Sequence, residues 1–251
     1  MSATAGSPLV QRASADPMRR TALVAGVLYL VTFVSIPTLA LYKPVQDNVG
    51  TFLLGAGSDA GVRWGALSEV IVGLAGIGTA VVLFPVLKRQ SETAALGLVA
   101  TRILEASLIF VGVASLLSMI ALRDQMAGTA GADSASLAIA GRSLLGSYNG
   151  AFLVSQSLMP ILNDLLLGYL FYRSRLVPRV LPIVAFIGAP LLLASDLAVF
   201  FGAYDRTAPL AALGALPIAV FELATGVWLT VKGFNPSSPL LQGRPEGAAR
   251  P

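Results

Sequence analysis

The sequence contains no cysteine and no histidine among its 251 residues. These absences exclude disulfides, thiolate nucleophiles, thiolate or imidazole metal ligands and a Ser-His-Asp relay. Haem and zinc would need ligands that the chain does not contain, so only a hard cation held by carboxylate and carbonyl oxygens is compatible with the composition. We therefore predict no cofactor and no metal, and we assign no catalytic residue.

Charge is also scarce. Only 12% of the residues are charged and 55% are hydrophobic, whereas soluble domains carry about 25% charged residues. The mean hydropathy is +0.78 and the apolar residues fall in long blocks, as a lipid solvent requires. The formal charge of +4 does not indicate nucleic acid, because the basic residues lie at the ends of apolar blocks and form no stripe interleaved with aromatics.

Six apolar runs are long enough to cross a bilayer. At 1.5 Å per residue the first run reaches about 33 Å, and it is too long for the core of a signal peptide. The six expected spans are 21–42, 64–87, 94–122, 147–172, 177–202 and 209–231. The predicted fold is an all-α, polytopic bundle of six transmembrane helices over residues 21–232, with disordered tails at 1–20 and 233–251.

Smaller features refine this topology. Asp47-Asn48 and Asp133-Ser134 precede apolar stretches as helix N-caps do, which predicts short interfacial helices in the connections 43–63 and 123–146. Prolines inside the expected spans predict kinks rather than breaks: Pro37, Pro85, Pro160, Pro190 and Pro217.

The distribution of Lys and Arg predicts the orientation. Twelve of the 17 basic residues fall on or towards the side of the two termini, so both termini are expected in the cytoplasm. The basic run Arg173, Arg175 and Arg179 either binds anionic lipid headgroups or is only a topology signal. The excess of Arg over Lys, with abundant Ala and Gly, suggests a GC-rich genome and a multi-pass protein of a bacterial cytoplasmic membrane.

Ionisable residues inside the spans are the candidates for function. Each costs roughly 2.5–3.5 kcal/mol or more at the centre of a membrane helix, so each should face the bundle interior and be paired or protonated. Arg102 and Asp164 both lie about 12 Å from the cytoplasmic helix ends, and Glu105 shares a face with Arg102. We therefore predict that Arg102 pairs with Asp164 or Glu105. The candidate interior polar site is Arg102, Glu105, Asp164 and Glu222, and the candidate outer acidic layer is Glu69 and Asp196.

Two interpretations of the buried charges remain open. In one, they line a polar path for a proton, a cation or a small solute, with Asn149, Gln156 and Asn163 adding hydrogen-bonding groups. In the other, they lock the helices together without further function. Partners in either case are membrane lipids, with a small-molecule or ion ligand for the first interpretation.

Other classes of function are also considered. The glycines at 73, 76 and 78 indicate close helix packing, and the small face around Gly73 and Gly76 is a candidate docking surface for a membrane partner of an accessory or structural protein. A lipid-modifying enzyme has the least support, because catalysis would rest on acids, Arg102 and hydroxyls such as Ser107.

Three segments resemble conserved blocks of a known family. They are RRTALVAGVLYLVTFV (19–34), FPVLKRQSETAALGLVATRILEA (84–106) and LGYLFYRSRLVPRVLPIVAFIGAPLLL (167–193). They are similar to the domain-of-unknown-function 4386 family of bacterial multispan membrane proteins, and the resemblance spans most of the chain. It implies the multispan fold, but no activity and no binding residues.

Overall fold

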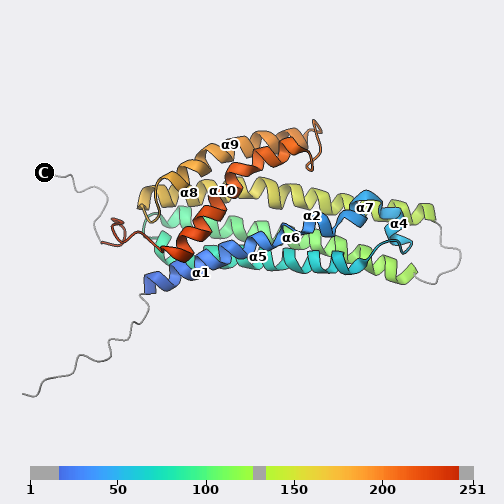
Figure 1. Cartoon of the computed structure of the whole chain (residues 1–251), viewed down its shortest axis with the longest axis horizontal. Helices are drawn as coiled ribbons and strands as arrows, with labels where there is room; N and C mark the ends of the chain where they lie inside the picture. The colour runs from blue at the N-terminus through green and yellow to red at the C-terminus, as the bar shows by residue number, and fades with distance from the viewer. Residues whose placement is uncertain (1–16, 127–133, 243–251) are drawn as a thin grey trace, which may run out of the picture.

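The computed structural model describes residues 17–126 and 134–242, and every regular element in these ranges is helical, as predicted. The helices pack as one elongated bundle (Figure 1). Their order is α1 (Pro17–Val31), the 3-10 segment η1 (Thr32–Ser35), α2 (Thr38–Leu41), α3 (Lys43–Asp47), α4 (Val49–Leu53), α5 (Asp59–Leu87), α6 (Glu92–Met126), α7 (Ser134–Phe152), the π-helical segment η2 (Leu153–Leu158), α8 (Met159–Ser174), α9 (Val180–Phe200) and α10 (Pro209–Val231).

Six stretches are long and apolar enough to cross a membrane, which confirms the predicted number of spans. They are Pro17–Ser35, Asp59–Leu87, Glu92–Met126, Ala135–Ser174, Val180–Phe200 and Pro209–Val231. The last agrees residue for residue with the expected span. The second, third and fourth are longer than predicted, because each helix continues beyond the apolar run that was expected to span the membrane.

The first span ends earlier than predicted. Instead of a kinked helix to Tyr42, α1 tightens into η1 and the path changes at Pro37. Pro37 has no N–H to donate to the carbonyl of Phe33, so the α-helical pattern cannot continue through it. Hydroxyls bond the carbonyls of this tightened region instead, as Thr32 Oγ1 does to Tyr29 O (2.6 Å) and Thr38 Oγ1 to Ser35 O (2.6 Å).

The two predicted interfacial helices had different outcomes. Asn48 caps α4 by accepting a hydrogen bond from the N–H of Thr51 (3.1 Å), so a short helix after Asn48 is confirmed. The helix expected after Ser134 is not a separate element, because α7 continues through η2 into α8. Asp133 lies outside the described residues.

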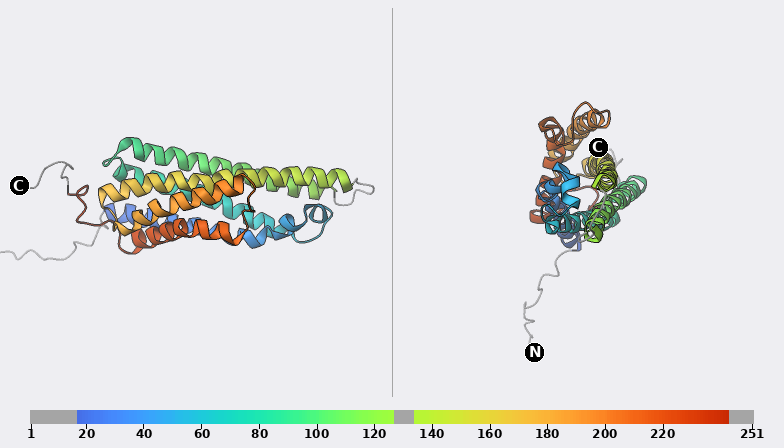
Figure 2. Two further views of the ribbon diagram at one scale, coloured as in Figure 1. Left: turned by 90° about the horizontal axis from the view of Figure 1, so that it is seen from above. Right: turned by 90° about the vertical axis from the view of Figure 1, so that its right-hand side faces the viewer.

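Two groups of helices differ in length. α9 has 21 residues and reaches about 32 Å, the thickness of the hydrocarbon core, whereas α6 has 35 residues and reaches about 53 Å. As a result α5, α6 and α7 project beyond the α9–α10 turn, away from the termini (Figures 1 and 2). We call this projection, together with α2, α3 and α4, the distal extension. It has an apolar core of its own, which includes Tyr42, Phe52, Leu116, Met119 and Tyr148.

The opposite end of the bundle, near the termini, is closed by packing and by the chain after α10. Arg19 donates to carbonyls at the end of α10, including Thr230 O at 2.7 Å. Ser238 Oγ donates to Ser174 O (2.6 Å) and Asn235 N donates to Leu176 O (2.8 Å). The predicted tails are therefore too long at both inner edges, since residues 17–20 are helical and residues 233–242 form turns that pack on α8. Their remaining parts, 1–16 and 243–251, lie outside the described residues.

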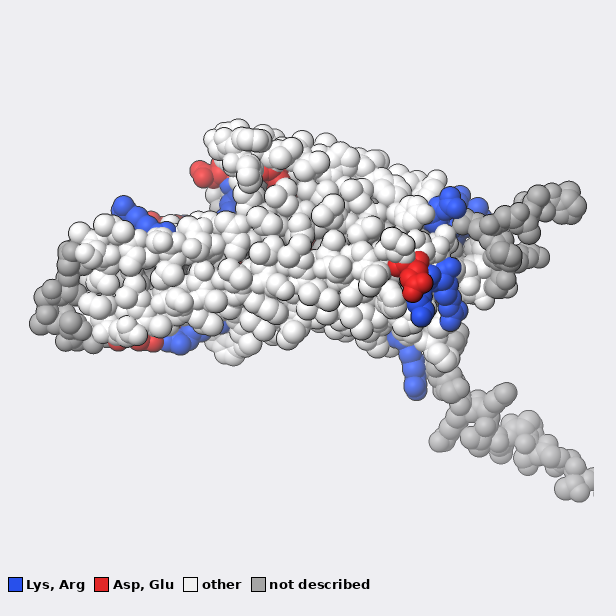
Figure 3. All heavy atoms as spheres, turned by 180° about the vertical axis from the view of Figure 1, so that it is seen from behind, with Lys and Arg blue, Asp and Glu red and all other residues white. Residues whose placement is uncertain are grey.

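The surface of the bundle fits a lipid environment. Large apolar side chains of the spans face outward, among them Leu74 (58% exposed), Val111 (54%) and Ile187 (58%). On the face drawn in Figure 3, charged side chains gather towards the ends and leave an uncharged band between them. The cytoplasmic location of the termini stays a prediction from the charge count.

Candidate functional site

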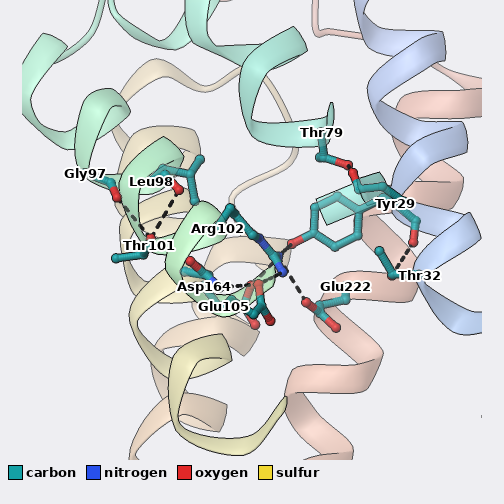
Figure 4. A network of polar contacts seen from close by, with 12 residues as sticks. Tyr29, Thr32, Thr79, Gly97, Leu98, Thr101, Arg102, Glu105, Asp164 and Glu222 are labelled. Carbon is teal, nitrogen blue, oxygen red and sulfur yellow. Dashed lines mark hydrogen bonds and ion pairs between the residues drawn. The ribbon is translucent and has the colours of Figure 1, made fainter. Parts of the chain in front are cut away.

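Arg102 is the centre of a buried polar cluster in the middle of the bundle (Figure 4). Its Nη1 donates to Glu105 Oε2 at 2.9 Å, and its Nη2 lies 3.4 Å from Glu222 Oε1 on α10. The predicted pairing of Arg102 with Glu105 is confirmed. The spacing of three residues on one helix places the two side chains on the same face, and the packing of α10 adds Glu222.

Asp164 joins the cluster through an intermediary. The hydroxyl of Tyr29 accepts a hydrogen bond from Arg102 Nη2 (3.1 Å) and donates one to Asp164 Oδ1 (3.3 Å). Among the described residues no ion pair joins Arg102 to Asp164, so the alternative pairing at equal depth is wrong. Equal depth does not ensure direct contact between side chains of two helices, and here the hydroxyl of Tyr29 bridges the two groups (Figure 4).

Tyr29 is the residue that the sequence reasoning missed. A signal was present, because tyrosines of membrane helices gather at the interfaces whereas Tyr29 lies in the interior of its span. A tyrosine so placed is expected to find a hydrogen-bond partner for its hydroxyl. Its side chain is fully buried, and its ring also lies 5.6 Å from the Arg102 guanidinium carbon.

Asn163 completes the contacts of Glu105. Its Nδ2 donates to Glu105 Oε2 at 3.0 Å, so one carboxylate oxygen accepts from both Arg102 and Asn163. The cluster thus contains one guanidinium and three carboxylates, Glu105, Asp164 and Glu222. With all four ionised it would carry a net charge of −2, which is costly in the bundle interior unless protons or a cation compensate it.

A cavity of ≈ 230 Å³ lies against this cluster. Arg102, Glu105 and Glu222 line it, and Asp164 does not. A volume of this size holds several water molecules or a small solute. Three of the four predicted interior residues therefore face a space that a ligand can occupy.

Two irregular helical segments form part of the remaining wall of this cavity. Thr32 and Ser35 belong to η1, and Gln156 belongs to the π-helical η2. η2 precedes Pro160, which has no N–H for the carbonyl of Gln156, so the widened turn accommodates a bond that an α-helix would lack. Interrupted helices of this kind surround binding sites in many membrane transporters.

A second, larger cavity of ≈ 530 Å³ adjoins the first on the side of the α9–α10 turn. Gln156 and Glu222 line both cavities, so these two side chains stand at the junction. Asp196 of α9 and Arg206 of the α9–α10 turn are on the wall of the larger cavity. On the other side of the cluster, towards the termini, a buried apolar core fills the bundle and includes Leu83, Leu98, Leu167, Leu170 and Phe171.

The two residues of the predicted outer acidic layer lie at separate sites. Glu69 Oε1 accepts from Tyr148 Oη (2.8 Å) and from Gln156 Nε2 (3.3 Å). Asp196 has no hydrogen bond or ion pair to Glu69 within the described ranges, and it faces the larger cavity instead. Similar depth in the bundle therefore does not bring these two acids together.

The glycines of α5 have the packing role that the sequence indicated. A Cβ at Gly73 would come 2.8 Å from the ring of Phe110 on α6, and one at Gly78 would come 3.1 Å from Leu28 on α1. Gly76 faces Arg102. The small-residue face at Gly73 and Gly76 is therefore covered by α6 of the same chain and is not a free docking surface.

Together these features define a multispan helical membrane protein with a buried Arg-carboxylate cluster on the wall of a cavity. The family model described as domain of unknown function (DUF4386) matches residues 24–233, so the chain belongs to this family. No curated protein and no solved structure matches the chain.

Proposed function

We propose that the protein lets a proton, a cation or another small solute cross a bacterial cytoplasmic membrane through its carboxylate-lined interior. The observation that carries the proposal is that Arg102, Glu105 and Glu222 line a cavity instead of being enclosed in a dry core. A purely structural ion network is most stable when packing and hydrogen bonds enclose it fully, so a cavity against it favours binding.

The geometry suggests where a positively charged solute would act. Arg102 is closer to Glu105 (2.9 Å) than to Glu222 (3.4 Å), and Glu222 also faces the larger cavity. A proton or cation arriving from that cavity would reach Glu222 first and would replace its contact with Arg102. Glu105 would keep its bonds to Arg102 and Asn163 during this exchange.

The helix pair α9–α10 is the element we expect to move. Its two helices pack closely on each other, since a Cβ at Gly188 would lie 3.0 Å from Pro217 and one at Gly214 would lie 2.8 Å from Ser195 Oγ. We expect two helices packed in this way to move together, as packed elements do in alternating access. Such a movement would carry Glu222 away from Arg102 and would disturb the apolar packing towards the termini.

Flux through reconstituted protein tests the proposal. Full-length protein in liposomes should conduct protons or one member of a panel of cations and small solutes, and Glu222→Gln and Glu105→Gln should each lower the rate about tenfold or more because a compensating carboxylate is lost. Glu92→Gln, an exposed carboxylate at the start of the same helix α6, is the matched control and should leave the rate unchanged. Absence of flux across the panel, or equal rates for all variants, would contradict the proposal.

A further inference from the structure

Besides Glu222, which it shares with the first cavity, the larger cavity has two oppositely charged residues on its wall, Asp196 and Arg206, that do not contact each other. Asp196 is only 5% exposed, its Oδ2 is buried without a hydrogen-bond partner, and it forms no ion pair within the described part of the chain. Arg206 lines the same cavity. The two side chains form no ion pair, since no nitrogen of Arg206 lies within 4.0 Å of an oxygen of Asp196.

Arg206 is held in place by neutral groups. Its Nη2 donates to Asn149 Oδ1 (3.2 Å), and its guanidinium carbon lies 4.3 Å from the centre of the Phe152 ring. No ion pair joins Arg206 to Glu69 in the part of the chain that the structure describes. Arg206 therefore has a fixed position and, in the described ranges, no carboxylate of its own.

The rest of the cavity wall is largely apolar. It includes Leu192 and Val199 of α9 and Ala212, Ala215 and Ile218 of α10. A cavity of ≈ 530 Å³ is within the range of small-molecule sites, which combine apolar walls with a few fixed polar groups.

We propose that this cavity binds a zwitterion, with an ammonium group at Asp196, an acid group at Arg206 and an apolar body along α9 and α10. An ammonium supplies the donors that Asp196 lacks, and a carboxylate or phosphate supplies the acceptor that Arg206 lacks. Two sources have this chemistry: a free amino acid with an apolar side chain, and the headgroup of an aminophospholipid. This inference deepens the proposed function, since such a ligand would occupy the cavity next to Glu222, but its test is binding rather than flux.

Calorimetry on the full-length protein in detergent compares leucine with two analogues. 4-Methylpentanoate lacks the ammonium group and 3-methylbutylamine lacks the carboxylate. Each should bind about tenfold or more weakly than leucine, because the missing group leaves one charge of the site without a partner. This comparison needs no variant, so it does not depend on whether a substitution folds. If 3-methylbutylamine binds as tightly as leucine, the site recognises only a cation and the proposal is overturned.

Variants assign the two contacts. Asp196→Asn should weaken leucine binding about tenfold or more and leave 4-methylpentanoate unaffected, and Arg206→Gln should weaken leucine binding and leave 3-methylbutylamine unaffected. Asp124→Asn and Arg142→Gln, at exposed positions away from this cavity, are the matched controls and should bind leucine as the wild type does. Leucine affinity that is unchanged in both cavity variants would overturn the proposal.

Lipid nanodiscs distinguish the two sources. If the ligand is a lipid headgroup, phosphatidylethanolamine should raise the melting temperature relative to phosphatidylglycerol in the wild type but not in Asp196→Asn. If it is a free amino acid, leucine should raise the melting temperature in either lipid. Failure of both leucine and phosphatidylethanolamine to bind would refute the inference.

The binding test is independent of the flux test. Glu105 does not line the larger cavity, so Glu105→Gln should keep leucine binding while it lowers flux. Leucine binding without any flux would leave the zwitterion site intact and remove the proposed function. Flux without any leucine or phosphatidylethanolamine binding would support the proposed function and refute the zwitterion site.

Discussion

Two buried glutamates, Glu105 and Glu69, are bonded in similar ways but by different kinds of donor. Each accepts two side-chain hydrogen bonds on one oxygen. The donors to Glu105 are the Arg102 guanidinium and the Asn163 amide, whereas those to Glu69 are the Tyr148 hydroxyl and the Gln156 amide. The first site depends on a charge and the second on neutral dipoles. The difference predicts how strongly each site responds when a donor is lost.

The largest effect should follow removal of the charge. Arg102→Met leaves Glu105 and Glu222 without their cation, so the free energy of unfolding should fall by about 3–5 kcal/mol, measured by reversible unfolding in mixed micelles. Arg89→Met, at an exposed position after α5, should change it by less than about 0.5 kcal/mol.

A double variant sharpens the interpretation of that loss. Arg102→Met combined with Glu105→Gln should recover part of the stability, because one of the uncompensated carboxylates is gone. If the single variant is as stable as the wild type, the cluster does not depend on the guanidinium and the comparison with Glu69 fails.

The next effect concerns the packing of the Glu69 site. Tyr42 stacks edge-on against Tyr148 with ring centres 5.5 Å apart, and Gly65 leaves room for the Tyr42 ring, since a Cβ there would come 2.8 Å from Cζ. Gly65→Ala should therefore lower the free energy of unfolding by about 1–3 kcal/mol. Gly150→Ala adds a Cβ with nothing within 4 Å of it. This substitution should raise the free energy of unfolding by about 0.5–1 kcal/mol, because glycine is less favourable than alanine in a helix interior. Equal effects of the two substitutions would disprove the packing argument.

The smallest effect should be the loss of a neutral donor. Tyr148→Phe removes the 2.8 Å bond to Glu69 but leaves Gln156 in place, so unfolding should become easier by about 1–2 kcal/mol. Tyr169→Phe on α8, at a position that is 43% exposed, is the control. A loss as large as that of Arg102→Met would show that the Tyr148 hydroxyl, although neutral, supports Glu69 as strongly as the guanidinium supports Glu105.

Much of the membrane topology followed from local sequence. The six spans are visible because a bilayer requires about 20 apolar residues in succession, a requirement that each segment meets by itself. Boundaries were less accurate where a helix continues beyond the expected span, as at the start of α7. Pro37 shows the same limit, because the sequence does not tell whether a proline kinks a helix or ends it.

Only part of the candidate site could be predicted from the sequence. The bond of Arg102 to Glu105 was predictable because both lie on one helix face, three residues apart. The contact with Glu222, the bridging role of Tyr29 and the separation of Glu69 from Asp196 depend on which helices are neighbours. Depth in the membrane gives one coordinate of a residue, and contact between helices requires the other two.

Sequence alone therefore determined the lipid environment, the helical secondary structure and the chemistries that are excluded. The cost of transferring a segment into lipid is a property of that segment, and the absence of Cys and His is a property of the composition, so neither depends on how the helices pack. Tertiary structure decided which charges meet and which face a cavity. Packing of α9 and α10 on η2 and α8 places Asp196 and Arg206 on one cavity wall without pairing them, and no local pattern could specify an arrangement among residues of separate elements.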